Sequence, residues 1–369
     1  MNPPIIIEAA TESLLFGLQF IALLIGGVSL LFLLVCLACA GSDCFIQIKR
    51  HGRHRLLALM FCACAATAAF AQNTRTASAN SYQERGNTWA AKGDYDHAIE
   101  DYSLGLAFAP DSAGLYANRG QARMLKGELE TAVANFTRAL QLDAKMIEAW
   151  VGRSYVRYRQ GDFDGVLSDT TAALKLNPRL SEAHHNRGLA YEAKGDYQAA
   201  LTAYEAALKF KPKVAATWNS RGAVRFRLGD YRGAISDQSQ AVKLDPQFAG
   251  AWMDRGCARL AQNDVNGAHT DFDQAIALNP QLAAAYFNRA QVWQNRQDFT
   301  RALRDYDQAI TLNPHYAHAW AQRGLVQLRL GNEVEAQRNF DECLRLDPTL
   351  KSALENLTQQ VRQELKPKP

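Results

Sequence analysis

Apolar and small side chains recur along most of this chain with a period of about 34 residues. The pattern runs without an insertion from Ala79 to Leu350 and makes eight consecutive units. Within each unit the apolar positions follow helical spacing in two stretches, separated by a short turn. In the fourth unit this predicts one helix over 181–194 and a second over 197–210. Gly195 and Asp196 supply the turn and the cap between them. The sequence therefore predicts an all-α array of antiparallel helix pairs.

One column of the repeat is an arginine in every unit, and in five units an aspartate follows sixteen residues later. The five pairs are Arg85 with Asp101, Arg153 with Asp169, Arg221 with Asp237, Arg255 with Asp271, and Arg289 with Asp305. Since each arginine falls on a first helix and each aspartate on a second, we expect a structural ladder of ion pairs between them. The alternative is that the arginines line a binding groove for an acidic partner.

The period and its columns resemble the tetratricopeptide repeat family over residues 79–350, about three quarters of the chain. The matching features are an early Trp or Tyr, a small residue after the arginine, a later Ala, a late Tyr or Phe, and a final Pro. The arginine column departs from the leucine that is commoner in the family. The resemblance implies a right-handed superhelical solenoid with a concave groove lined by the first helices. It also makes residues 351–369 a C-terminal cap helix and tail, which such arrays need for solubility.

The resemblance further implies a scaffold that binds a protein or peptide in this groove and carries out no catalysis. The family's groove positions, projected onto this sequence, give a set rich in amides and aromatics, which suits an extended peptide. The projected set is Gln83, Asn87, Asn118, Gln121, Tyr155, Tyr158, His185, Asn219, Phe226, Met253, Phe287, Asn288 and Gln291.

Some members of the family grip the carboxylates of a chaperone C-terminus with three cations and two asparagines. Asn87 and Asn118 match the two asparagines, but Gln83, Glu148 and Gly152 stand where the cations belong. Without a bidentate donor, an anionic C-terminus has no clamp here. We therefore expect a partner of another kind.

The N-terminal region, residues 1–71, has a different pattern. Residues 14–40 are an uncharged apolar run longer than the roughly 20 residues that cross a bilayer, which predicts a transmembrane helix. A basic loop at 49–55 and a shorter apolar segment at 56–71 follow, and the latter ends in Ala69-Phe70-Ala71 like a secretory signal. Residues 72–78 would then link this region to the repeats.

The topology follows from which of these segments cross the membrane, because basic loops stay in the cytoplasm. We expect a membrane-anchored or exported bacterial adaptor with its repeats in the periplasm. If only residues 14–40 span, the repeats are cytoplasmic. A second hypothesis is a structural component of a membrane complex that acts through its apolar N-terminal segment.

Composition narrows the function classes. The net charge is only +4 and no basic stripe is visible, so nucleic acid is not expected as a partner. Five of the seven cysteines lie within residues 1–71, which is no disulfide framework. The sequence contains no phosphate loop and neither of the hydrolase motifs HExxH and GxSxG. We therefore expect no enzyme, no metal and no small-molecule cofactor.

Overall fold

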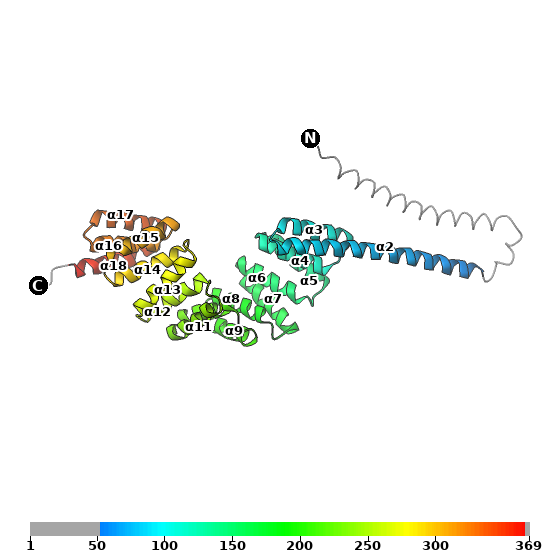
Figure 1. The fold of residues 1–369 in the computed structure, drawn as a ribbon, viewed down its shortest axis with the longest axis horizontal. Helices are drawn as coiled ribbons and strands as arrows, with labels where there is room; N and C mark the ends of the chain where they lie inside the picture. The colour runs from blue at the N-terminus through cyan, green and yellow to red at the C-terminus, as the bar shows by residue number, and fades with distance from the viewer. Residues whose placement is uncertain (1–51, 366–369) are drawn as a thin grey trace, which may run out of the picture. The chain divides into compact units, whose positions relative to one another are not determined.

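The computed structural model describes residues 52–365, and within this range the chain is entirely helical (Figure 1). The predicted transmembrane helix at 14–40 lies outside the described residues, as does the start of the basic loop. The helices are α2 Gly52–Ala91, α3 Tyr95–Phe108, α4 Ala113–Lys126, α5 Leu129–Leu142, α6 Ile147–Arg159, α7 Phe163–Leu176, α8 Ser181–Ala193, α9 Tyr197–Phe210, α10 Ala215–Arg227, α11 Tyr231–Leu244, α12 Ala249–Ala261, α13 Val265–Leu278, α14 Ala283–Asn295, α15 Phe299–Leu312, α16 Ala317–Arg329, α17 Glu333–Leu346 and α18 Lys351–Glu364.

The chain divides into two units, residues 1–80 and 81–369. The described part of the first unit belongs to α2, which passes through the predicted signal-like segment 56–71 and the predicted linker 72–78 without a break. Among the helices of residues 52–365, none combines the length and the apolar character needed to cross a bilayer.

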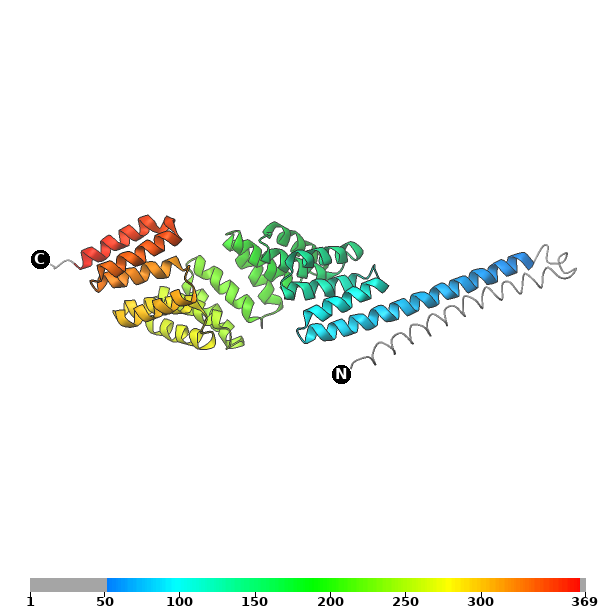
Figure 2. The same cartoon turned by 90° about the horizontal axis from the view of Figure 1, so that it is seen from above.

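In the second unit the helices follow one another as antiparallel pairs (Figure 1 and Figure 2). The first helices of successive repeats are the end of α2 and then α4, α6, α8, α10, α12, α14 and α16. Each packs against the second helix that follows it, α3 through α17 in odd numbers, and from α4 onward each also packs against the second helix of the repeat before. The prediction of an all-helical repeat array is confirmed, and α8 and α9 match the bounds predicted for the fourth unit to within one residue.

The turn inside each repeat follows a fixed local chemistry. In the fourth repeat Gly195 adopts a left-handed conformation with φ of 78°, which ends the first helix. The Asp196 carboxylate then accepts a hydrogen bond from the Ala199 N–H at 3.1 Å and caps the second helix. Asn263 and Gln297 take the glycine's place in the sixth and seventh repeats, with φ of 64° and 61°.

In five of the eight repeats the core contains an aromatic ring packed on a glycine. A Cβ atom added at Gly188 on α8 would lie 2.5 Å from the Tyr204 ring on α9, so only glycine admits the ring there. Tyr204 is fully buried, as is Ala200 one turn before it. The small columns of the sequence therefore hold the two helices close by making room for an aromatic ring.

The array ends on α18, which covers the apolar face of the last repeat. Leu354 and Val361 are buried in one cluster with Leu325 and Phe340. This packing gives the final repeat the neighbour that every other repeat already has.

Candidate functional site

The arginine column forms paired hydrogen bonds across the two helices of a repeat. Arg255 Nε donates to Asp271 Oδ2 at 2.9 Å and Nη2 donates to Oδ1 at 2.7 Å, while its guanidinium lies 4.6 Å from the centroid of the Trp252 ring. The same two-bond pair joins Arg85 with Asp101, Arg153 with Asp169, Arg221 with Asp237, and Arg289 with Asp305. The structure thus places all five predicted pairs in contact.

The fourth repeat departs from this ladder. Ala203 stands where the aspartate belongs, and the buried Nε of Arg187 has no hydrogen-bond partner. Arg187 Nη2 instead lies 3.0 Å from His184 Nδ1, and His184 Nε2 lies 3.0 Å from the Pro178 carbonyl oxygen. His184 takes the place of the tryptophan and stacks on Phe210 at a centroid distance of 5.7 Å.

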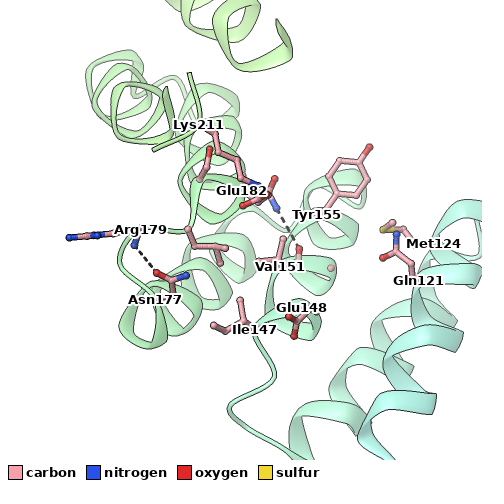
Figure 3. Close-up of a pocket in the computed structure, with 14 residues that line it drawn as sticks. Gln121, Met124, Ile147, Glu148, Val151, Tyr155, Asn177, Arg179, Glu182 and Lys211 are labelled. Atoms are coloured by element: carbon pink, nitrogen blue, oxygen red, sulfur yellow. Dashed lines mark hydrogen bonds and ion pairs between the residues drawn. The ribbon is translucent and has the colours of Figure 1, made fainter. Parts of the chain in front are cut away.

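We use the name first-helix surface for the side that the α4, α6, α8, α10, α12, α14 and α16 side chains present away from the second helices. One hollow on it is a cavity of about 610 Å³ between α4, α6 and α8 (Figure 3). Gln121 and Met124 reach it from α4, Val151 and Tyr155 from α6, and Glu182 from α8. The cavity combines an apolar floor with polar groups at its edge, as sites for peptide side chains do.

Charged groups of both signs surround this cavity. Glu148 lies on its wall, and Glu182 pairs with Lys211 at its edge. Burial is the largest single influence and raises the pKa of Glu182, but the hydrogen bond and the charge of Lys211 together with a backbone hydrogen bond outweigh it and hold that pKa below its usual value. Tyr155 is 38% exposed, so its ring is open to a ligand.

The structure brings together only part of the projected groove set. Gln121 and Tyr155 line the same cavity, whereas Gln291 lines a separate hollow of about 300 Å³ with Leu260 and Gln322. Other members bond to neighbouring repeats. The contacts are Asn118 Nδ2 to Asn87 Oδ1 at 3.2 Å, His185 Nδ1 to Thr217 Oγ1 at 3.1 Å, Asn219 Nδ2 to Asp254 Oδ2 at 2.8 Å, and Asn288 Nδ2 to Cys257 Sγ at 3.2 Å.

Phe287 does not belong to the open surface, which corrects its projection as a groove residue. It is only 9% exposed because its ring packs against Tyr306 and Tyr316, with centroids 5.8 and 4.8 Å away. Met253 is half-buried against a core cluster that contains Phe272. The remaining members, Gln83, Tyr158 and Phe226, are half-buried.

Several residues of the first-helix surface are not among the groove positions projected from the sequence. They include Met124, Val151 and Lys211 at the cavity, and Glu192 and Asp254 further along the array. A sequence signal for part of them exists, because a mostly polar column recurs once in each repeat. Its members are Glu84, Asn118, Gly152, Asn186, Ser220, Asp254, Asn288 and Gln322.

Burial sets the protonation of the titratable groups in the middle of this surface. It lowers the pKa of His185 to about 4, so the imidazole is neutral near pH 7. It raises the pKa of Glu192 against the opposing hydrogen bond from the Tyr204 hydroxyl, and raises that of Asp254 against the hydrogen bond from Asn219. It also raises the pKa of the Cys257 thiol to about 12, which makes this cysteine a poor nucleophile.

The His, Cys, Asp and Glu side chains of residues 52–365 do not form a metal site. No group of three or more lies close enough to hold an ion there. The chemistry offered by the described surface is therefore hydrogen bonding, apolar contact and charge pairing.

Comparison with protein families finds repeated matches over this array. Models described as tetratricopeptide repeats match residues 113–146, 181–214, 215–248, 253–296, 283–316 and 317–350. No curated protein matches the chain.

Solved structures with a similar fold include three that cover more than half of this chain. A chain of the APC/C hetero-tetramer Cut9-Hcn1 matches with a TM-score of 0.60 and 14% identity, over 72% of this chain and 52% of its own length, so the match spans about half of it. A tetratricopeptide repeat protein from Parabacteroides merdae matches with a TM-score of 0.53 and 19% identity, over 72% of this chain and 99% of its own. PilF from Pseudomonas aeruginosa matches with a TM-score of 0.52 and 16% identity, over 59% of this chain and 97% of its own. These likenesses show the fold.

Proposed function

Because the chain belongs to the tetratricopeptide repeat family, we propose that it is a protein-interaction scaffold whose first-helix surface binds a segment of another protein. The binding segment is extended, and its side chains enter the surface one repeat at a time. Repeat arrays suit this task because each repeat adds one more row of exposed side chains to a continuous surface.

The cavity between α4, α6 and α8 carries this proposal. Its volume of about 610 Å³ falls in the range of sites that hold a ligand group. Met124, Ile147 and Leu180 offer apolar contact, while Gln121 and Asn186 offer amide groups for a peptide backbone. The open Tyr155 ring supplies the kind of aromatic contact that dominates binding energy at interfaces.

A capture experiment tests the proposal. The unit 81–369 is immobilised and the proteins it retains are compared with those retained by a Gln121→Ala, Tyr155→Ala variant. The variant should lose the partners, because both side chains face the cavity and neither belongs to the buried core. Val334→Ala on α17 is the matched control, since Val334 is 67% exposed and far along the chain from the cavity. Equal recovery by wild type and the cavity variant would reject this binding site.

We also propose that the N-terminal segment attaches the array to a membrane or directs its export, with the repeats outside the cytoplasm. The support is the uncharged run at 14–40 and the signal-like segment at 56–71. Determining the first residue of the mature protein tests it. A start at Gln72 is expected for a cleaved, exported protein, whereas an intact N-terminus in the membrane fraction points to an anchor. An intact chain in the cytosolic fraction would exclude both.

A further inference from the structure

Two carboxylates on the first-helix surface differ from the other buried acids of the array. The buried aspartates of the ladder, such as Asp169 and Asp271, each form an ion pair with an arginine. Glu192 on α8 and Asp254 on α12 are half-buried, and neither forms an ion pair within residues 52–365. A carboxylate that loses water without gaining a cation is costly, so its retention calls for a reason.

Each of these two acids accepts a hydrogen bond from one neighbouring side chain. Asp254 Oδ2 accepts from Asn219 Nδ2 at 2.8 Å, but the Asn219 Oδ1 atom is buried with no donor. Glu192 Oε2 accepts from the Tyr204 hydroxyl at 2.8 Å. The charge of Asp254 is also close enough to raise the pKa of Glu192, which places the two acids in one neighbourhood.

A second buried acceptor without a donor, on Gln238, belongs to the helix that packs against α12, the helix of Asp254. Gln238 on α11 is 1% exposed, and its Oε1 atom is buried without a donor. It occupies the aromatic column, and its Cγ packs on Gly222 as the Tyr204 ring packs on Gly188. This column reaches the first helix of the next repeat.

In the second and third repeats, a side chain of the aromatic column contacts the first helix of the next repeat. The Phe136 ring lies 2.6 Å from the position of a Cβ atom on Gly152, sixteen residues later. The residue sixteen positions after Gln238 is Asp254. Because α11 packs against α12, Gln238 and Asp254 hold the positions that Phe136 and Gly152 hold in the earlier repeats, and from this register we infer that the two side chains face each other.

We propose that Glu192, Asn219, Gln238 and Asp254, here called the acceptor cluster, receive a basic side chain, arginine or lysine, of the bound protein segment. This inference rests on the proposed function, because it names the chemistry of the partner that the first-helix surface selects. A guanidinium brings five N–H donors and an ammonium three, while the cluster offers oxygen acceptors that lack donors. The incoming cation would also pair the two acids that have none.

His185 and Arg227 are the charged or titratable residues to consider beside the acceptor cluster. His185 is neutral near pH 7 because burial lowers its pKa to about 4, so it does not repel a cation. The charge of Arg227 lowers the pKa of Glu192 by more than the charge of Asp254 raises it, yet Arg227 forms no ion pair with that acid among the described residues.

Peptide selection on the full chain tests the proposal. A random dodecapeptide library is selected on wild type, and the affinities of the enriched peptides are measured for wild type, Glu192→Gln, Asp254→Asn and the double variant. Both substitutions keep the side-chain shape and remove the charge. Glu130→Gln on the exposed face of α5 is the control for a general loss of charge. Thermal unfolding checks that every variant is folded, and the single variants keep the test informative if the double variant is not.

Enriched peptides should share one arginine or lysine. Replacing that arginine by citrulline, which has the same shape without the charge, should weaken binding to wild type and to Glu130→Gln by about tenfold or more. The same replacement should have little effect on Asp254→Asn with Glu192→Gln. Exchange of arginine for lysine shows which head group fits better.

Two other outcomes overturn the inference in distinguishable ways. Peptides that need Gln121 and Tyr155 but bind the charge variants as tightly as wild type would reject the acceptor cluster and leave the proposed function standing. Failure to enrich any peptide that the Gln121→Ala, Tyr155→Ala variant loses would reject the proposed function and the inference together.

Discussion

Arg255 connects two repeats through one side chain and is held by Asp271. Two of its nitrogens bind the Asp271 carboxylate in its own repeat, at 2.9 and 2.7 Å. Its third nitrogen, Nη1, donates to the Ser239 hydroxyl of the preceding repeat at 3.2 Å. The aspartate therefore orients an arginine that links neighbouring helix pairs.

This relationship predicts strong coupling between the two residues in stability measurements. Arg255→Ala should lower the free energy of unfolding by about 3–5 kcal/mol, because it leaves the buried Asp271 without a cation. Asp271→Ala should cost a similar amount, and the double variant should cost clearly less than the sum of both. Urea unfolding of the four proteins gives the coupling energy. Additive losses would show that the pair has no structural role.

The packing of the Tyr204 ring on Gly188 predicts that alanine has opposite effects on stability at Gly188 and at Gly114. Gly188→Ala should destabilise the protein by about 1–3 kcal/mol, since the new methyl group would overlap the buried Tyr204 ring. Gly114→Ala is the control, because no atom lies within 4 Å of its added Cβ. That change should stabilise by about 0.4–1 kcal/mol through the reduced freedom of the unfolded chain. Thermal melts of both variants decide, and equal effects would contradict the packing described here.

The missing aspartate partner of Arg187 in the fourth repeat predicts a stabilising substitution. Ala203→Asp would place a carboxylate sixteen residues after Arg187, whose Nε now lacks a partner. Charge-assisted hydrogen bonds should raise the free energy of unfolding by about 1.5–3 kcal/mol, less the cost of burying the new charge. Ala203→Asn should gain less, as it would form a single bond like that of Arg119 with Asn135. The gain should disappear in an Arg187→Ala background, and a fall in stability on Ala203→Asp with Arg187 present would show that the site cannot admit a carboxylate.

The titration of Asp254 predicts that the Asp254→Asn variant is more stable than wild type at neutral pH and loses this advantage as the pH falls. Burial raises its pKa in the folded state, so the folded protein takes up this proton at higher pH than the unfolded chain does. The stability of wild type relative to Asp254→Asn must therefore rise as the pH falls from above the folded pKa toward the ordinary value of 3.8. Because the charge of Asp254 also raises the pKa of Glu192, both proteins are compared in a Glu192→Gln background, so that the difference reports Asp254. Melts from pH 7 to pH 4 would contradict this account if the difference stayed constant.

Much of the fold could be predicted from the sequence because the repeat period carries it. The Gly195 and Asp196 turn and the apolar spacing around it fix α8 and α9 to within one residue. The spacing of sixteen between arginine and aspartate also identifies a real contact, since every helix–turn–helix of the same length brings those two positions together. Period and turn chemistry are local properties that a sequence displays directly.

The surface could be predicted less well because it depends on packing between repeats. Phe287 falls at a projected groove position, yet Tyr316 from the next repeat covers it. The link from Arg255 to Ser239 requires the relative placement of two repeats, which spacing within one unit does not define. The surplus of acceptors near Asp254 depends on one departure from the aromatic column, Gln238, whose effect appears one repeat away.

The arginine links between repeats are not spread evenly, and this divides the array into mechanical blocks. Nη1 bonds to the preceding repeat join the first three repeats to one another and the last four to one another. These bonds are Arg119 to Ser103, Arg153 to Thr137, Arg255 to Ser239, Arg289 to Asp273 and Arg323 to Asp307.

Within residues 52–365, neither Arg187 nor Arg221 forms such a bond, so both junctions of the fourth repeat lack the link. Under tension or partial denaturation the array should therefore open first at α8 and α9. The two flanking blocks would then move as separate rigid levers about the repeat between them.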